Sequence, residues 1–362
     1  MRINRTTTHP SLFGVTGRSN RDTTEKSHWG KNEFNASFPT ALLCYMHSKK
    51  IKPVIIKVDH HFKTYHDTID VKKLFGMDPD SESTYFSFED SYTPFQGYVK
   101  GQLERSDLVV MDQANTKRPW KRGFEIKLTA LPDNSTYEAP DSEQSCEMVF
   151  RPTAIVHLAL SIASLFEKKK KDLLKVLSPV CSKVYNWRGK EEVSGFTNDF
   201  IATLDSAFSL VLRNQEPFIL QPIWKTVGKA SILHDHCLDV FVWTNLAFTR
   251  LFIDTITDDD QRGMKRPQRC IFWLARMLFD FAQVGVITPS LIASEMAYGL
   301  QTDKAFSVSG IKSLKYLKSK QLTSPRIHKN EIKNIILGGG QLLLSPERRF
   351  DAAVVNTPGL FK

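Results

Sequence analysis

The sequence contains few cysteines, and they follow no recognisable pattern. Its 362 residues hold five cysteines, an odd number without the paired spacing of metal ligands. Small secreted domains depend on closely spaced, paired cysteines, so this composition argues against a disulfide scaffold and favours reduced thiols. We therefore expect a cytoplasmic protein.

Long apolar runs are also missing. A transmembrane helix needs about 20 consecutive apolar residues, whereas the apolar stretch at 241–248 is bracketed by Asp239 and Arg250. Residues 1–22 are polar and basic and lack the apolar segment of a secretion signal. The sequence thus predicts no association with a membrane.

Signatures of several common enzyme classes do not occur. The triplet Gly338-Gly339-Gly340 is not followed by the Gly-Lys-Ser/Thr of a phosphate-binding loop, and there is no Gly-x-Ser-x-Gly nucleophile elbow. Histidines within 60–67 and within 234–239 lack the second set of ligands that would complete a tetrahedral zinc site. We interpret the first group as an exposed polar turn and the second as residues that cap or pack.

Acidic residues are fewer than basic ones. The chain has 39 Asp and Glu against 49 Lys and Arg, a formal net charge of +10. Such an excess favours a polyanionic partner, and nucleic acid is the leading one because neutralising phosphates releases counterions. The alternative is a mildly basic protein without such a partner.

Hydrophobic periodicity predicts both helices and strands. Apolar residues spaced by three or four predict helices at 32–48, 153–166, 200–212, 241–253 and 271–284. Runs rich in β-branched residues predict strands at 52–58, 106–112, 123–129 and 218–227. Residues 76–97 are predicted to form an acidic loop, and Thr288 with Pro289 to start another helix.

Two of these strands carry a constellation of charged residues. Side chains alternate between the faces of a strand, so Glu125 and Lys127 point the same way while Phe124 and Ile126 point into a core. If the strand at 106–112 pairs with the strand at 123–129, Asp107 can lie beside Glu125. Two carboxylates and an ammonium would then surround one small space.

This constellation suits hydrolysis of a phosphodiester. Mg²⁺ binds hard oxygen ligands through one or two carboxylates, so Asp107, Glu125 and the backbone carbonyl of Ile126 are predicted metal ligands. Lys127 would orient or help to deprotonate the attacking water. The turn between the strands, 113–122, is basic and either contacts a DNA backbone or is simply a charged hairpin tip. Its basic residues are Lys117, Arg118, Lys121 and Arg122.

The arrangement resembles the PD-(D/E)xK nuclease superfamily. Ser106-Asp107 stands in place of Pro-Asp, and Glu125-Ile126-Lys127 matches the (D/E)xK element. The resemblance implies an α/β fold in which helices flank a mixed central sheet. It also implies that a carboxylate of the first helix can join the site, and Glu33 is the matching position. Proline contributes no ligand, so its replacement by serine leaves the chemistry intact.

The segment around the motif is similar to the HindVP family of type II restriction endonucleases. The residues that carry the likeness are Glu104-Arg105-Ser106-Asp107 and the run from Phe124 to Asp133. The resemblance implies Mg²⁺-dependent double-strand cuts in DNA at a short palindromic site, expected to be GRCGYC. A palindromic target implies a homodimer, and a restriction system implies a cognate DNA methyltransferase.

The domain organisation expected from this resemblance has three parts. Residues 1–30 form a flexible arm, residues 31–170 the catalytic nuclease core, and residues 171–362 a mainly helical region for DNA recognition and dimerisation. Two other functions stay open at this point. The protein could be a structure-specific repair or recombination nuclease of the same superfamily, or a DNA-binding protein in which the three charged residues form an ordinary ion pair.

Overall fold

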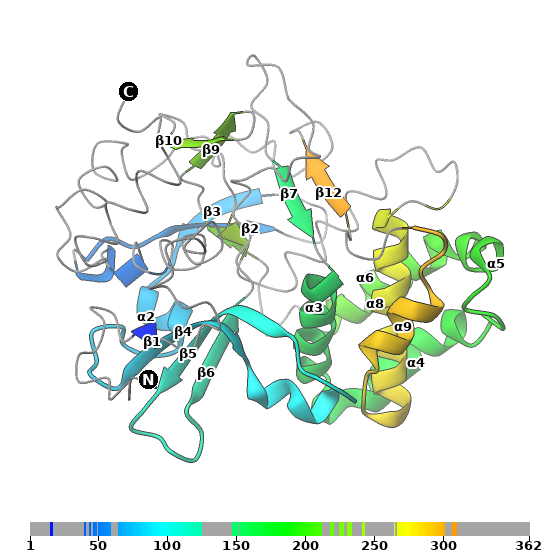
Figure 1. Ribbon diagram of the computed structural model, residues 1–362, viewed down its shortest axis with the longest axis horizontal. Coiled ribbons are helices and arrows are strands. Elements are labelled where there is room, and N and C mark those ends of the chain that lie inside the picture. Colours follow the sequence, from blue (N-terminus) through cyan, green and yellow to red (C-terminus); the bar gives the residue numbers. More distant parts are fainter. Residues whose placement is uncertain are drawn as a thin grey trace, which may run out of the picture.

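The chain combines short helices with mainly antiparallel sheets. The computed structural model describes residues 15–16, 40, 43–44, 46–48, 50–58, 64–124, 147–150, 152–211, 218–220, 224–227, 230–233, 241–242, 264, 266–300 and 306–309. The β4–β5–β6 sheet and a group of helices lie side by side in Figure 1.

A four-stranded sheet carries the predicted motif. Its order is β1-β4-β5-β6, with β1 parallel to β4 and the other pairs antiparallel. The strands are β1 (Val15–Thr16), β4 (Thr84–Ser91), β5 (Arg105–Asp112) and β6 (Trp120–Phe124). The sheet is therefore mixed, as expected, although its parallel pair is only two residues long.

One face of this sheet is apolar and is covered by α2 (Val71–Phe75). The ring of Phe75 meets Phe86 of β4 edge-on at 5.1 Å and Phe124 of β6 at 6.2 Å between centroids. Leu108 and Val110 of β5 pair with Phe124 and Arg122 and are fully buried. The apolar residues at alternate strand positions thus form the contact with the helix.

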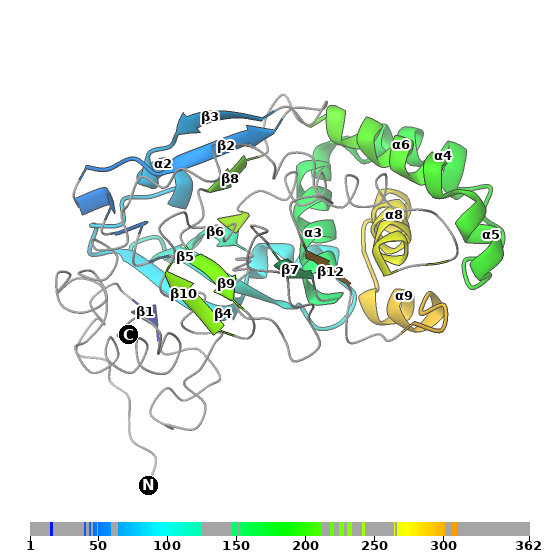
Figure 2. The same cartoon turned by 90° about the horizontal axis from the view of Figure 1, so that it is seen from above.

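A second sheet forms a neighbouring layer in Figure 2. Its order is β11-β8-β2-β3, and every pair is antiparallel. Its strands are β2 (Val54–Val58), β3 (Thr64–Thr68), β8 (Phe218–Leu220) and β11 (Phe241–Val242). Strands β9 (Trp224–Val227) and β10 (Ala230–Leu233) form an antiparallel hairpin. Strands β7 (Glu147–Phe150) and β12 (Phe306–Ser309), which are far apart in the sequence, form another antiparallel pair.

The helices form a bundle around α8. The members are α3 (Pro152–Leu165), α4 (Lys170–Cys181), α5 (Lys190–Gly195), α6 (Thr197–Ser209), α8 (Arg266–Val284) and α9 (Pro289–Glu295). A 3₁₀ turn, η2 (Glu167–Lys169), joins α3 to α4. Helices α3, α4, α6 and α9 all contact α8, as Figures 1 and 2 show.

The sequences of α3 and α8 explain their central position. In α3 every residue from Ala154 to Ala163 is buried, and α8 is buried almost all round from Gln268 to Ala282. A helix that is buried on all sides needs neighbours on all sides. Charged residues of α8 are matched locally: the Arg269 guanidinium donates to the Leu300 carbonyl at 3.2 Å, and Arg276 pairs with Asp280 at 2.8 Å.

The segment between β4 and β5 fastens the sheet to the bundle. It contains the 3₁₀ helix η1 (Thr93–Tyr98). The Ile287 N–H donates to the Tyr98 carbonyl at 2.7 Å, and the Lys100 N–H donates to the Ile287 carbonyl at 2.8 Å. The Tyr98 ring also meets Phe281 of α8 edge-on at 5.5 Å. The strand that carries Asp107 is thus reached through a turn held by α8 and α9.

Several predicted elements are confirmed. The strands expected at 52–58 and 106–112 are β2 and β5, and the helices expected at 153–166, 200–212 and 271–284 are α3, α6 and α8. Thr288 occupies the N-cap position of α9, without a capping hydrogen bond from its side chain, and Pro289 is the first residue of the helix. The expected helix at 32–48 is described only in its second half, where residues 40–48 include helical positions.

Other predictions were wrong. Residues 76–97 contain strand β4 instead of a loop throughout, and residues 241–242 form strand β11 instead of the start of a helix. His66 and Asp67 lie in strand β3 rather than in a turn. The strand expected at 218–227 is two strands, β8 and β9. Strand pairing decided each conformation: β3 pairs with β2, β4 with β5, β8 with β2 and β11, and β9 with β10. Local periodicity does not contain this information.

The structure describes parts of the predicted regions. Within the arm expected at 1–30, the described residues are 15 and 16, and they pair with β4. Helix α4 begins at Lys170 and packs on α8. Among the described helices, none is both long enough and apolar enough to cross a membrane.

Candidate active site

Asp107 lies near the beginning of β5, at a partly exposed position. The residues on either side of it in the strand, Ser106 and Leu108, are buried. Its neighbours on the same face are Arg105 and Val109, because side chains alternate along a strand. The carboxylate is thus carried on a fixed strand while it stays within reach of solvent.

The pairing of β5 with β6 is antiparallel, as the motif required. Leu108 is opposite Phe124, Val109 opposite Gly123, and Val110 opposite Arg122. A bulge follows between Val110 and Met111, so that Met111 pairs with Trp120. At the Asp107 end, the described part of β6 finishes at Phe124. Glu125, Ile126 and Lys127 lie outside the described residues, as does Glu33.

The face of the sheet that bears Val109 is covered by Tyr92. A Cβ atom on Gly123, the residue opposite Val109, would lie 2.8 Å from Cγ of Tyr92, so the tyrosine occupies the space of a side chain at this position. Paired residues share a face of a sheet. Tyr92 therefore packs on the same face as Asp107. Burial raises the pKa of the Tyr92 hydroxyl, while the charge of Arg122 opposes that shift.

The second aspartate of β5 lies at the opposite end of the strand. The Asp112 carboxylate is 3.1 Å from the Lys121 ammonium, and this hydrogen bond lowers the pKa of Asp112. Five residues along a strand span about 16 Å. The structure thus separates Asp107 from Asp112 by most of the length of β5.

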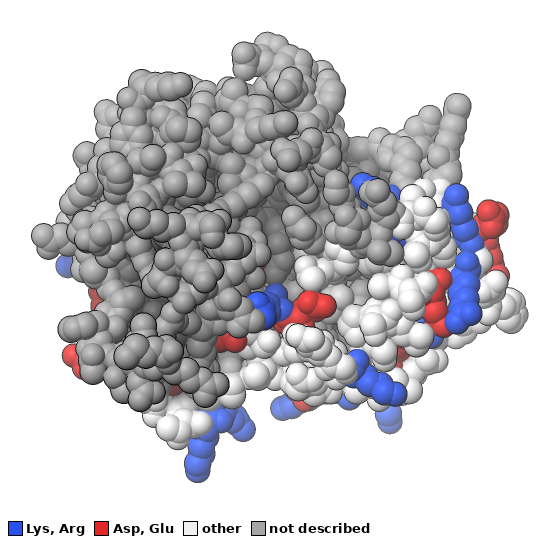
Figure 3. All heavy atoms as spheres, viewed as in Figure 1, with Lys and Arg blue, Asp and Glu red and all other residues white. Residues whose placement is uncertain are grey.

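The predicted DNA-contacting residues gather at the Asp112 end of the hairpin. Lys117 and Arg118 are exposed in the turn, and Lys121 and Arg122 lie in β6. The turn is shorter than expected, because β6 already begins at Trp120. Basic side chains project from the lower left of the surface in Figure 3, where Figure 1 places the tip of this hairpin. The basic turn is therefore not adjacent to Asp107; the length of β5 separates them.

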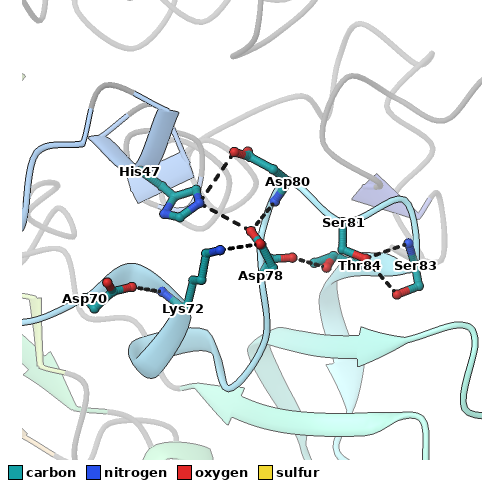
Figure 4. Close-up of polar contacts among 8 residues, drawn as sticks. All are labelled: His47, Asp70, Lys72, Asp78, Asp80, Ser81, Ser83 and Thr84. Carbon is teal, nitrogen blue, oxygen red and sulfur yellow. Dashed lines mark hydrogen bonds and ion pairs between the residues drawn. The ribbon is translucent and has the colours of Figure 1, made fainter.

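Among the described residues, one group of side chains has the spacing of metal ligands. It consists of His47, Asp78 and Asp80, whose ligand atoms all lie within 4.8 Å of one another. Figure 4 shows the His47 ring directed between the two carboxylates. Its Nε2 atom lies 3.3 Å from Asp78 and 3.4 Å from Asp80.

Protein groups already hold this cluster together. The Lys72 ammonium pairs with Asp78 (Figure 4), and this hydrogen bond lowers the pKa of the Asp78 carboxyl and raises the pKa of Lys72. The backbone N–H of Asp80 donates to Asp78 at 3.1 Å. The cluster connects the helical residues near position 47 and α2 to the turn that leads into β4. A cation could bridge it, but the ion pairs explain its geometry.

The cluster is distinct from the predicted site. The hydroxyl of Thr84 donates to the carbonyl of Asp78, and Thr84 pairs with Asp112. The cluster therefore lies at the Asp112 end of the sheet, away from Asp107. No local pattern joins position 47 to positions 78 and 80, so sequence periodicity could not reveal it.

Glu89 is a further acidic residue near the predicted site, and the sequence prediction had placed it in a loop. It lies in β4 between Phe88 and Asp90, which pair with Leu108 and Ser106 of β5. The backbone of β4 thus carries an acidic residue at the level of Asp107. The alternation Phe86-Ser87-Phe88-Glu89 was the signal for a strand with one apolar face.

Comparison with known proteins identifies the family. The family model of the HindVP restriction endonuclease matches residues 29–361. The chain belongs to the HindVP restriction endonuclease family. The HindVP family was predicted from the segment Glu104–Asp107 and the run from Phe124 to Asp133, and that prediction is confirmed, together with the class of enzyme, a type II site-specific deoxyribonuclease.

Two relatives in the HindVP family are similar over almost their full lengths. The type II restriction enzyme HgiDI of Herpetosiphon aurantiacus is 43% identical, with 98% of this chain and 97% of that enzyme covered. The probable type II restriction enzyme HindVP of Haemophilus influenzae is 36% identical, with 98% and 95% covered. No solved structure matches the chain.

Proposed function

We propose that this HindVP-family protein makes Mg²⁺-dependent double-strand cuts in DNA at a short palindromic site, expected to be GRCGYC. The proposed site consists of Asp107, Glu125 and Lys127. One observation carries the proposal: β5 and β6 pair so that Leu108 is opposite Phe124. Asp107 precedes Leu108 in β5, and Glu125 follows Phe124 in the chain, so the two residues would be opposite each other in an antiparallel pair. Continuation of this register by one position would bring the two carboxylates together.

The donors present suit a divalent cation. Asp107 offers a hard carboxylate oxygen at a partly exposed position of a rigid strand, and Glu125 and the Ile126 carbonyl would complete an oxygen-rich set of the kind Mg²⁺ prefers. When bound, such an ion supplies an activated water and positive charge against the phosphate. Glu33 is a further proposed carboxylate of this site.

The chain's own groups would carry out the remaining tasks. Lys127, two residues after Glu125 and on the same face of an extended strand, would orient the attacking water and take part in its deprotonation. Its ammonium would also offset the negative charge of the scissile phosphate. Because Asp107 lies in strand β5, its carboxylate would be held in a fixed position for the metal ion.

DNA contacts are proposed at the basic turn. Its exposed residues Lys117 and Arg118 lie about 16 Å or more from Asp107, since the length of β5 separates them. Duplex DNA rises about 3.4 Å per base pair, so this separation corresponds to roughly five base pairs. We propose that Lys117, Arg118, Lys121 and Arg122 hold the backbone to one side of the cut.

A palindromic target also determines the proposed assembly. Two copies related by a two-fold axis would each cut one strand, so the working unit would be a homodimer. A cognate DNA methyltransferase would protect the host's own sites in the cytoplasm. The proposed fold is a PD-(D/E)xK core at 31–170, with the region at 171–362 serving DNA recognition and dimerisation.

A cleavage assay on a long duplex of mixed sequence tests this function. In Mg²⁺ we expect discrete fragments whose ends map to GRCGYC. A smear, or cuts at junctions alone, would favour the alternative of a repair or recombination nuclease. If wild type and Lys127→Ala are equally inert in Mg²⁺ and in Mn²⁺ while both bind DNA, the protein is a non-catalytic DNA-binding protein.

The two aspartates of β5 provide a matched pair of variants. Asp107→Asn should lower the cleavage rate by more than about a hundredfold, the upper end of what loss of an outer-shell partner costs. Asp112→Asn makes the same chemical change at the other end of the strand and should cleave at nearly the wild-type rate. The reverse pattern would place the site at the Asp112 end of β5.

A further inference from the structure

A buried polar contact joins the predicted motif to the helical bundle. The hydroxyl of Ser106 and Nδ1 of His157 lie 3.2 Å apart and form a hydrogen bond. Both side chains are almost completely buried, with exposed fractions of 1% and 4%. Ser106 directly precedes Asp107 in β5, and His157 lies in the second turn of α3. The contact therefore connects the strand of the proposed site to a central helix.

The His157 side chain is itself held in place. Its flanking residues Val156 and Leu158 are buried, and its ring meets Phe95 edge-on at 5.7 Å. Phe95 in turn packs against Tyr92 at 4.8 Å, the residue that covers the Asp107 face of the sheet. The histidine is thus held by a chain of ring contacts that runs through Phe95 to Tyr92.

A buried hydrogen bond at this position restricts how β5 can move. A buried polar side chain that separates from its partner loses the hydrogen bond and gains no bond to water in return. Its separation therefore costs free energy, which stabilises the paired arrangement. A slip of β5 by one residue would also turn Ser106 to the opposite face of the sheet. The Ser106–His157 bond therefore favours one position of β5 relative to α3, and with it one position of Asp107.

We infer that the Ser106–His157 hydrogen bond positions Asp107 for DNA cleavage. In the PD-(D/E)xK pattern a proline, whose backbone is restricted, precedes the aspartate. Here a serine stands in that place, and its bond to His157 restricts the same residue through a tertiary contact. His157 is a positioning residue: it acts on the carboxylate through Ser106. The inference rests on the proposed function of Asp107.

Substitutions at both ends of the bond test it. Ser106→Ala removes the hydroxyl, whereas Ser106→Thr keeps it. His157→Asn keeps a hydrogen-bonding atom close to the place of Nδ1, whereas His157→Gln moves that atom to the place of Nε2 and His157→Leu removes it. Ser164→Ala is the matched control, because it removes a hydroxyl from α3 two turns farther along, where the serine donates to the Ser161 carbonyl.

Two quantities are measured for the full-length protein. The first is the single-turnover cleavage rate in Mg²⁺, and the second is the Kd for DNA in Ca²⁺. We expect Ser106→Ala, His157→Leu and His157→Gln to lower the rate by about tenfold to a hundredfold, with the Kd unchanged. Ser106→Thr, His157→Asn and Ser164→Ala should keep most of the rate. The double variant Ser106→Ala/His157→Leu should be no slower than the slower single variant, because the two substitutions remove the same hydrogen bond.

The outcomes separate this inference from the proposed function. If Asp107→Asn cleaves normally, the proposed function fails. If Asp107→Asn is inactive but Ser106→Ala cleaves like Ser106→Thr, the positioning role alone is overturned. Equal losses of rate and DNA affinity would also overturn it, because they indicate general damage. Should the His157 variants not fold, the comparison of Ser106→Ala with Ser106→Thr decides the question.

Discussion

Asp112 in the β4–β5–β6 sheet and Asp280 in the bundle differ in their ionisation although their side chains have the same exposed fraction, 19%. Each accepts a hydrogen bond from a cation, Lys121 at 3.1 Å and Arg276 at 2.8 Å. The pKa of Asp112 is lowered, chiefly by that bond, whereas the pKa of Asp280 is raised, chiefly by burial. The helices around Asp280 remove more water from the carboxylate than its neighbouring cation can offset.

The difference shows that the sheet and the bundle place their charged residues in different environments. The sheet keeps Asp107 and Asp112 partly exposed at its two ends, within reach of solvent. The bundle is a dense, mainly apolar structure, and within it Arg276 and Asp280 pair with each other. Such a bundle contributes rigidity, and its contact with β5 through His157 and Ser106 brings that rigidity to the sheet.

The largest expected effect lies in the core of the bundle. Phe200 is fully buried and meets Trp187 at 5.6 Å and Phe272 at 5.4 Å between ring centroids. Phe200→Ala should lower the free energy of unfolding by about 3–5 kcal/mol because it leaves a cavity among aromatic rings. Chemical denaturation measures the loss, with Leu210→Ala at an exposed helix end as control. A loss no larger than that of the control would contradict the view of the bundle as the rigid region.

A smaller effect is expected where Tyr92 covers the sheet. Gly123→Ala would place a Cβ atom 2.8 Å from Cγ of Tyr92, and we expect it to lower the free energy of unfolding by about 1–3 kcal/mol through overpacking. In a Tyr92→Ala background the same change should cost less, since the overlapping ring is gone. A double-mutant cycle measures this coupling. If Gly123→Ala costs the same in both backgrounds, Tyr92 is not the group that excludes a side chain.

The smallest effects concern the two aspartates themselves. Lys121→Met should raise the pKa of Asp112 toward its ordinary value, because the largest cause of the lowering is lost. Arg276→Met should raise the pKa of Asp280 further, because burial then acts without its opposing cation. NMR titration of the two carboxyl groups measures both changes. A fall in either pKa would contradict the conclusion that the neighbouring cation lowers the pKa of each carboxyl group.

The two shifts have opposite consequences for stability. A carboxyl group with a lowered folded pKa, such as Asp112, stabilises the fold above its unfolded pKa, and this contribution is lost as the pH falls through the folded pKa. A group with a raised folded pKa, such as Asp280, contributes below its unfolded pKa, and this contribution is lost as the pH rises through the folded pKa.

Much of the fold followed from local patterns. The apolar runs of β5 and α8 were long and regular, and both elements are where the sequence predicted them. Strand β4 was missed because Asp78-Pro79-Asp80 and Thr93-Pro94 frame it with turn signals. Strand β11 was taken for a helix because two apolar residues fit either period. Its pairing with β8 decides the matter.

Only part of the candidate site follows from the sequence. Asp107 was proposed because the motif's residue types and spacing are local in sequence, and the structure shows it partly exposed in β5. His157 was passed over, since a lone histidine in an apolar helix carries no sign of its partner 51 residues earlier. The cluster of His47, Asp78 and Asp80 was missed for the same reason.

The sequence by itself thus determined the apolar run of β5, the apolar character of α3, the helical periodicity of α8, and the motif residues that identify the HindVP family. Only the tertiary structure decided the register of β5 against β6, the bond between Ser106 and His157, and the opposite pKa shifts of Asp112 and Asp280. The physical reason is range. Periodicity and residue chemistry act over a few neighbours, whereas register, burial and partner depend on which distant segments meet.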